Sequence, residues 1–180
     1  MESKSNTSKL DAKFNGLGFS NTHPQLGLPT IKKYLKDFDY GNQDFSGDPG
    51  QDNALTQAWL SSSLKISALE QLKFMQSMLK RKFSLSKQAV KNTEANMYIE
   101  TSPLGWRLYG KTGSGRGSQP DSNKAFSYED GWFVGFIKND EQTYIIVTNF
   151  TAPDDSDDNI SPGIQAKNIS IDILTKMGLY

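Results

Sequence analysis

Helical periodicity dominates the first half of the chain after a polar start. Around Ile31 the apolar positions recur at intervals of three and four residues, which predicts an amphipathic helix beginning near Thr30. A capping box begins at Ser67, with Glu70 three residues later, and opens a helix that is predicted to run to about Lys82. Shorter helices are predicted over residues 55–60 and 87–96.

The period changes near residue 97, where aromatic and β-branched residues become frequent. Strands are predicted over residues 98–99, 106–111, 131–138 and 143–150. The polar residues 139–142 join the last two strands as a hairpin loop. A final helix is predicted over residues 162–177. Helices followed by an antiparallel meander and a closing helix predict an α+β fold.

The N-terminal segment differs from the rest in composition. Residues 1–25 are rich in Ser, Asn, Lys and Gly, so we expect a disordered or non-native leader there. Residues 26–180 are expected to form the folded portion. Residues 1–20 lack the apolar core of a signal peptide, so the chain as written is expected to stay in the cytoplasm.

Composition excludes several functions. Twenty basic and twenty acidic residues cancel, so no net field favours a nucleic acid or an anionic membrane as partner, and no run is long enough to span a membrane. The chain has no cysteine, and its one histidine, His23, lies in a polar segment. A Ser-His-Asp triad is therefore not expected. The acidic run at residues 154–158 lacks the glycine and glutamate of a calcium loop, and neither a metal nor a cofactor is predicted.

One predicted strand ends in a chemically distinctive way, because Lys111, Thr112 and Gly113 come after the aromatic stretch at residues 106–109. Such an ending serves phosphate binding or the recognition of a substrate carboxylate in penicillin-recognising serine enzymes. The letters of a phosphate-binding loop match from Gly105 onward. However, the residues between Gly105 and Gly110 are typical of a strand, and the glycine-rich stretch after Thr112 cannot open a helix. The match to a phosphate-binding loop is therefore accidental. When this stretch is considered alone, an ordinary strand that ends in a polar loop is an equally good interpretation.

Four short motifs succeed one another along the chain: Tyr40-Gly41-Asn42, the Trp-Leu segment from Ala58 to Ser67, Lys111-Thr112-Gly113, and Gly131-Trp132-Phe133-Val134-Gly135. Their order and spacing resemble the class D (oxacillinase-type) serine β-lactamases, within the penicillin-recognising enzyme family. The resemblance implies the C-terminal portion of a β-lactamase/transpeptidase-like α+β fold that is incomplete at its N-terminus. It also implies a periplasmic or secreted location.

The resemblance implies a role for several residues. Lys111 and Thr112, with Gly113, would bind the substrate carboxylate, and the backbone N–H of Ser114 would be one of two oxyanion donors. Trp59 would hydrogen-bond to the N-carboxylated lysine that is the general base of the family. The resemblance also implies that Leu60 would line the cavity of that lysine.

The nucleophile of the family is missing from its expected place. Its Ser-x-x-Lys lies well upstream of Tyr-Gly-Asn, but the 39 residues before Tyr40 contain no such motif. Ser62 and Ser84 each begin a Ser-x-x-Lys string, yet one lies inside the Trp-Leu segment and the other in a polar loop between helices. The nucleophile is therefore unassigned. The arginine that the family often places near the start of the last helix is also absent, which leaves Ser161 as a hydroxyl substitute.

These observations predict a β-lactamase-like, penicillin-binding domain whose own catalytic competence is in doubt. Its ligand would be a β-lactam or a peptidoglycan-like small molecule. Without front strands the sheet should have an uncovered edge, so a complementing chain or a homo-oligomer is an expected partner. Two alternatives stay open: a β-lactam sensor or penicillin-binding domain that acylates without rapid release, and a non-catalytic fragment that serves as an interaction surface.

Overall fold

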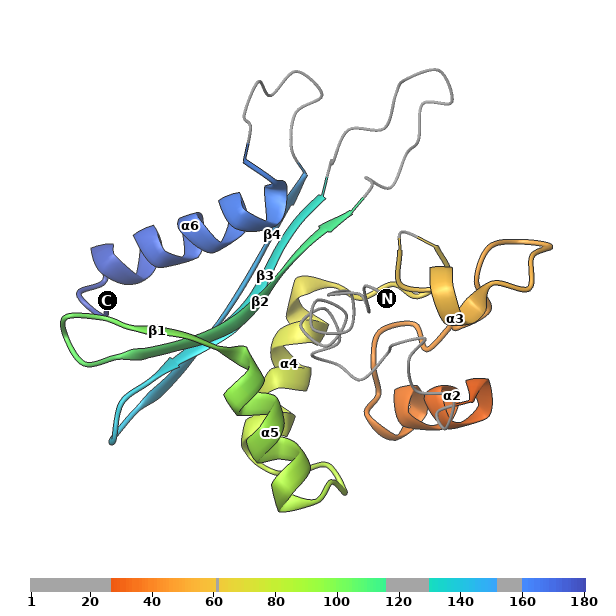
Figure 1. Cartoon of the computed structure of the whole chain (residues 1–180), viewed down its shortest axis with the longest axis horizontal. Helices are drawn as coiled ribbons and strands as arrows, with labels where there is room; N and C mark the ends of the chain where they lie inside the picture. The colour runs from red at the N-terminus through yellow and green to blue at the C-terminus, as the bar shows by residue number, and fades with distance from the viewer. Residues whose placement is uncertain (1–26, 61, 116–129, 152–159) are drawn as a thin grey trace, which may run out of the picture.

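The predicted order of elements is confirmed by a computed structural model, which describes residues 27–60, 62–115, 130–151 and 160–180 (Figure 1). The helices and strands, in chain order, are α2 (Leu28–Asp37), α3 (Ala54–Gln57), α4 (Ala68–Leu79), α5 (Lys87–Met97), β1 (Tyr98–Thr101), β2 (Arg107–Gly115), β3 (Asp130–Lys138), β4 (Thr143–Thr151) and α6 (Pro162–Lys176). The α+β prediction is therefore correct. The expected leader, His23 and the acidic run at residues 154–158 lie outside the described residues.

The four strands form one antiparallel sheet in the order β1-β2-β3-β4. The three long strands pair over their whole length, from Arg107↔Lys138 to Gly115↔Asp130 and onward to β4 without a shift of register. β1 is short and pairs with β2 only through Arg107, Leu108 and Tyr109. Helix α6 lies on one face of the sheet, and α4 and α5 lie on the other (Figure 1).

Alternation along the strands builds a separate core on each face of the sheet. Leu108, Phe133 and Ile137 are fully buried on the face that α6 covers, where they pack with Ala166 and Leu174. The next positions point the other way. The rings of Tyr109 and Phe136 stack at 4.7 Å between centroids and pack with residues of α4 and α5.

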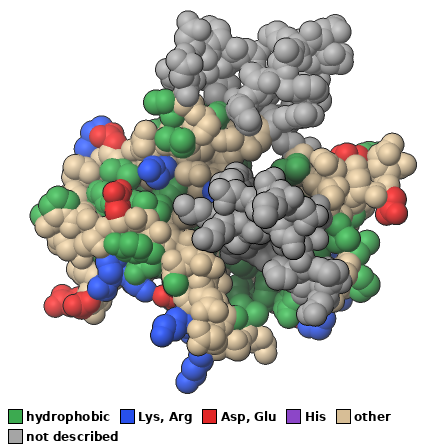
Figure 2. Space-filling model, in the orientation of Figure 1, with side chains coloured by type: hydrophobic (Ala, Val, Ile, Leu, Met, Phe, Trp, Pro, Cys, Tyr) green, Lys and Arg blue, Asp and Glu red, His purple; other side chains and the backbone are tan. Residues whose placement is uncertain are grey.

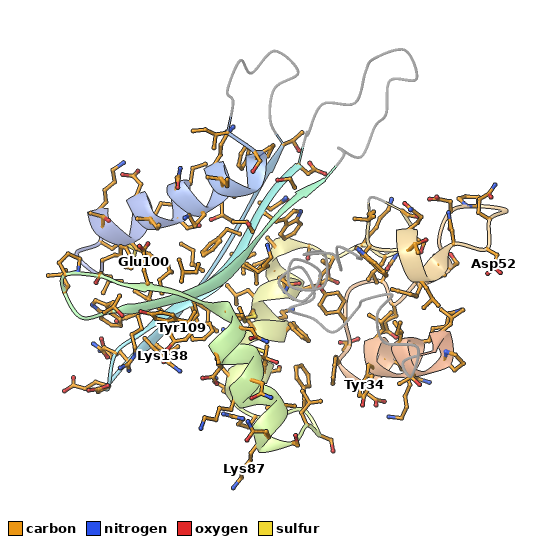
Figure 3. All side chains as sticks on the ribbon, viewed as in Figure 1. Tyr34, Asp52, Lys87, Glu100, Tyr109 and Lys138 are labelled. Atoms are coloured by element: carbon orange, nitrogen blue, oxygen red, sulfur yellow. The ribbon has the colours of Figure 1, made fainter. Side chains whose placement is uncertain are left out.

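A charged pair joins α5 to the sheet. The Lys138 Nζ lies 2.8 Å from the Glu94 Oε2 and 4.7 Å from the centre of the Tyr109 ring. Figure 3 shows the labelled Lys138 and Tyr109 side by side where α5 meets the strands. The lysine therefore caps the aromatic stack while its charge is paired.

Helix α4 begins as predicted, because both hydrogen bonds of the capping box are present. The Ser67 Oγ accepts from the Glu70 N–H, and the Glu70 carboxylate accepts from the Ser67 hydroxyl and backbone N–H, which holds the pKa of that carboxyl below its usual range. The helix ends at Leu79, earlier than predicted. Arg81 has a φ of +57°, and this left-handed residue turns the chain out of the helix before Lys82.

A third apolar cluster holds the N-terminal helices and the long loop between them. Its buried members are Ile31, Leu35, Phe45, Ala54 and Ala58. Helix α3 is a single turn, shorter than the predicted 55–60, and it joins this cluster through Ala54. None of the helices in the described residues has both the length and the apolar character to cross a membrane.

Candidate functional site

The register of β2 with β3 sorts the residues of the Lys-Thr-Gly motif onto the two faces of the sheet. Lys111 pairs with Val134, and alternation places it on the same face as Tyr109, toward α4 and α5. Thr112 faces the side of α6. The flexible lysine nevertheless reaches its neighbour, because its Nζ is 2.6 Å from the Thr112 carbonyl oxygen and 3.3 Å from the Thr112 Oγ1. A cation and a hydroxyl therefore meet at this end of the strand.

The outer edge of β2 is open beside this pair. Because β1 stops pairing at Tyr109, residues 110–115 have no strand partner on that side among the residues that the structure describes. Gly113 and Ser114 are exposed. The backbone groups at this edge are therefore accessible to a ligand that approaches as an additional strand would.

Gly110 and Gly113 are both in β2, but internal packing requires a glycine only at position 110. A Cβ at Gly110 would lie 2.4 Å from the Phe133 ring, so internal packing excludes any side chain there. A Cβ at Gly113 would meet only the Cβ of Trp132, at an ordinary 3.6 Å. Packing within the described residues does not require glycine at 113. Close approach of a ligand to the backbone would require it.

The start of α6 is attached to the same strand end. The Gly163 N–H donates to the Ser114 Oγ at 3.0 Å, and a Cβ at Gly163 would lie 2.6 Å from the Gly113 carbonyl oxygen. Ser161 is the N-cap of α6, but its hydroxyl does not cap the helix and makes no hydrogen bond within the described part of the chain. The role of Ser161 as a substitute for an arginine stays a prediction.

Two of the motifs form one unit. At Gly41 the φ is +55°, and a Cβ there would lie 2.1 Å from the Lys65 carbonyl oxygen. The Asn42 side chain donates to the Ser63 carbonyl at 2.8 Å and accepts from the Lys65 N–H at 3.0 Å. The Tyr40 hydroxyl donates to the Gln71 Oε1, and burial raises the pKa of Tyr40 to about 12. The Tyr-Gly-Asn turn thus supports the end of the Trp-Leu segment.

The Trp-Leu pair lies at the surface of this unit. Trp59 is half-buried and stacks on Phe45 with 5.7 Å between ring centroids. Leu60 is 53% exposed. A residue that lines a closed cavity would be buried, so the cavity expected at Leu60 is not formed by the described residues. Its role beside a carboxylated lysine stays a prediction.

The chain matches the family described as "Penicillin binding protein transpeptidase domain" over residues 15–174. This chain belongs to that family. Beta-lactamase OXA-1 of Escherichia coli is 42% identical over 156 residues, which cover 86% of this chain and 54% of that protein. Probable beta-lactamase YbxI of Bacillus subtilis (strain 168) is 38% identical over 86% of this chain and 48% of its own length. The predicted resemblance to class D β-lactamases is confirmed.

Solved structures agree with this membership. The class D β-lactamase OXA-427 is 32% identical, with a TM-score of 0.74 over 85% of this chain and 62% of that one. The C-terminal domain of the Bacillus licheniformis BlaR penicillin-receptor is 26% identical, with a TM-score of 0.73 over 94% of this chain and 61% of that one. The chain therefore spans about half the length of the curated relatives that it matches.

Neither Ser-x-x-Lys string has the geometry of a penicillin-recognising nucleophile. On a helix, a lysine three residues after a serine lies on the same face. Ser62 precedes α4 in a non-helical segment, and its hydroxyl donates to the Asp48 carboxylate at 2.7 Å. Ser84 is exposed and lies outside α5, of which Lys87 is the first residue, at the end far from the sheet (Figure 3). The nucleophile remains unassigned.

One side chain near the motif had no predicted role. Trp132 pairs with Gly113 in the sheet and lies on the same face as Lys111. It forms a half-buried aromatic wall beside the exposed strand end. The sequence signal was present in the Gly-Trp motif, but only the register shows that Trp132 pairs with Gly113 of β2.

Among the described residues, no group of three or more His, Cys, Asp or Glu side chains is placed to hold a metal ion.

Proposed function

We propose that this chain carries the β-lactam recognition surface of a class D-like site, on the open edge of β2. Lys111 and Thr112 bind the carboxylate of the ligand through a charge-assisted contact and a hydroxyl. Gly113 lets the ligand approach the backbone, and the Ser114 N–H donates to the β-lactam carbonyl as one of two oxyanion donors. The ligand class is a β-lactam or a peptidoglycan-like small molecule.

One observation carries the proposal. The Lys111 ammonium and the Thr112 hydroxyl meet at 3.3 Å beside a strand edge that no described residue pairs with. A planar carboxylate needs a cation and a hydrogen-bond donor at such a spacing, and an extended ligand needs free backbone groups next to them. Membership of the penicillin-binding family supports the identity of the ligand.

Hydrolysis needs two further parts. The reaction of the family forms an acyl-serine, so it requires a nucleophilic serine and a base. We assign to Trp59 the contact with an N-carboxylated lysine as base, and to Leu60 the lining of the same cavity. The serine and that lysine are assigned to no residue of this chain. Turnover in this proposal therefore requires a complementing chain that supplies both groups.

A sensor or penicillin-binding domain is the second candidate. Its support is the likeness to the BlaR penicillin-receptor domain, with a TM-score of 0.73. A sensor and a hydrolase share the recognition strand and differ in the rate at which the acyl-enzyme is hydrolysed. We also propose that the chain acts outside the cytoplasm in either role. Fractionation of cells that produce the chain tests this location.

Intact-protein mass spectrometry after incubation with a penicillin, beside a chromogenic cephalosporin assay, tests the proposal. Turnover identifies a hydrolase. A stable adduct identifies a sensor, and peptide mapping then locates the serine that carries the adduct. With neither, binding is measured by ligand-observed NMR on the folded chain. Penicillin binding that Lys111→Ala weakens supports recognition without chemistry. Absence of any binding contradicts the proposal and favours a non-catalytic interaction surface.

A further inference from the structure

The first turn of α6 meets the sheet at Ser114, the residue whose backbone N–H the proposed function uses as an oxyanion donor. Ser114 of β2 pairs with Gly131 of β3. The buried Gly163 donates its N–H to the Ser114 Oγ at 3.0 Å, across 49 positions of the sequence. The end of β2 is therefore under a tertiary constraint from the helix.

Glycines allow the backbone of α6 to come close to both strands here. A Cβ at Gly163 would lie 2.6 Å from the Gly113 carbonyl oxygen, and a Cβ at Gly131 would lie 2.4 Å from the Pro162 carbonyl oxygen. A side chain at either position would therefore separate the helix from the strands. The first turn of α6 thus rests on the backbone of β2 and β3 together, at the pair that contains Ser114.

Farther along, side chains hold α6 to the sheet. Ala166 and Ser170 are fully buried, and the Ser170 hydroxyl lies 2.7 Å from the Thr148 hydroxyl of β4. Ile169, by contrast, is 43% exposed, and Figure 2 shows apolar side chains at the surface over α6. Gly163 is the only glycine of the helix, so the close contact through glycine is confined to the first turn.

One peptide plane carries both the contact with α6 and the proposed donor. The carbonyl of Gly113 and the N–H of Ser114 belong to the same planar trans peptide unit, in which the two groups point in opposite directions. Gly163 packs against the carbonyl side of this plane and binds the hydroxyl of Ser114. The Ser114 N–H is therefore directed away from this contact, and the helix restricts rotation of the plane.

We propose that the Ser114 hydroxyl is a positioning group for the oxyanion donor. By accepting the Gly163 N–H, it holds the end of β2 against α6 and so aligns the Ser114 backbone N–H with the carbonyl of a bound β-lactam. This role rests on the proposed function, which assigns that N–H to the carbonyl. A donor is most effective when its direction is fixed before the ligand binds, because no reorganisation is then needed.

Two alanine variants separate this role from a general contribution to stability. Ser114→Ala removes the acceptor of the Gly163 N–H and keeps the backbone. Ser170→Ala is the matched variant, because it also removes a hydroxyl between α6 and the sheet, but on the side of β4. In amide NMR spectra without ligand, Ser114→Ala should shift the Gly163 signal and broaden those of residues 113–115. Ser170→Ala should leave the signals of residues 113–115 unchanged.

The affinity for a penicillin, measured by ligand-observed NMR on the whole chain, gives the functional readout. Ser114→Ala should raise the dissociation constant about fivefold, as expected when one hydrogen bond loses its alignment. Ser170→Ala should bind penicillin as wild type does. Ser114→Thr keeps a hydroxyl acceptor and should recover most of the affinity that Ser114→Ala loses.

The stretching frequency of the β-lactam carbonyl reports the alignment of the donor directly. A hydrogen bond from an aligned N–H polarises this carbonyl and lowers its frequency, which infrared difference spectra measure at saturating penicillin. Ser114→Ala should return the frequency toward the value of free penicillin. Ser170→Ala should keep the lowered value, since it does not touch the peptide plane between Gly113 and Ser114.

Equal affinity and equal carbonyl frequency for Ser114→Ala and wild type, in a chain that binds penicillin, overturn the positioning role and leave the proposed recognition intact. Equal losses in Ser114→Ala and Ser170→Ala also overturn it, because reduced stability then explains both. A folded wild-type chain that binds no penicillin overturns the proposed function and the positioning role together. Circular dichroism of each variant confirms that the compared proteins are folded.

Discussion

The Gly163 N–H donates to the Ser114 Oγ at 3.0 Å and fixes the first turn of α6 to the strand that carries the Lys-Thr-Gly motif. The contact is close because Gly163 has no side chain. The Ser114 side chain thus serves the fold on one face of β2, whereas the proposed contact with a ligand uses its backbone N–H. A substitution at Gly163, on the α6 side of this contact, is therefore expected to change the free energy of unfolding.

Gly163→Ala should destabilise the chain by up to about 2 kcal/mol. The new Cβ would lie 2.6 Å from the Gly113 carbonyl oxygen, and such overpacking typically costs about 1–3 kcal/mol, which the better helix propensity of alanine offsets by about 1 kcal/mol. Urea denaturation measures the change. Gly113→Ala is the matched control, because its Cβ meets only an ordinary contact, and its free energy of unfolding should change by less. Equal stability of the two variants contradicts this account.

Lys111→Ala should weaken penicillin binding about tenfold or more, because a charge-assisted contact to the carboxylate is lost. The affinity of the folded chain is measured by ligand-observed NMR. Lys176→Ala is the control, since this lysine is exposed on α6 and its ion pair is with Asp172 on the same helix. Equal affinity of Lys111→Ala and wild type would sink the proposed role of Lys111.

Gly41→Ala should be far more disruptive than Gly50→Ala, although both glycines have a positive φ. At Gly50 nothing lies within 4 Å of an added Cβ, so only backbone strain of about 1 kcal/mol applies. At Gly41 the Cβ would lie 2.1 Å from the Lys65 carbonyl oxygen, which adds roughly 2 kcal/mol or more. Thermal unfolding compares them, and similar midpoints would show that the Tyr-Gly-Asn turn is not attached as described.

Stability should fall as the pH rises above the ordinary tyrosine pKa of 10.0, because burial raises the pKa of Tyr40 to about 12 in the folded chain. Between these values the unfolded state has lost a proton that the folded state keeps, so deprotonation favours unfolding. Urea denaturation across this window measures the slope. Tyr40→Phe should flatten it while lowering stability at neutral pH, through loss of the hydrogen bond to Gln71.

Part of that alkaline slope should survive in Tyr40→Phe. Burial and the neighbouring Glu100 raise the pKa of Tyr180 to about 12 as well, so this residue contributes in the same direction. The double variant Tyr40→Phe/Tyr180→Phe should flatten the slope further. An unchanged slope in the single variant shows that Tyr40 is not the group that titrates.

Local signals determined the elements of this fold. The capping box at Ser67 and the i, i+3, i+4 spacing after Ile31 specify helices through bonds within one segment, and aromatic and β-branched residues indicate the strands. The membership of the family also came from the sequence, because its motifs are short runs of letters. The end of α4 was missed, since the left-handed Arg81 has no local signature in the sequence.

Tertiary structure alone decided how the motifs meet. No periodicity reveals that Asn42 binds the backbone at Ser63 and Lys65, or that the hydroxyl of Ser62 is engaged by Asp48. These bonds join segments that are distant along the chain, and loop closure rather than local propensity determines whether they form. The open edge of β2 among the described residues is likewise a property of strand order. A strand's own residues specify its two faces, whereas its neighbours in the sheet depend on the path of the whole chain.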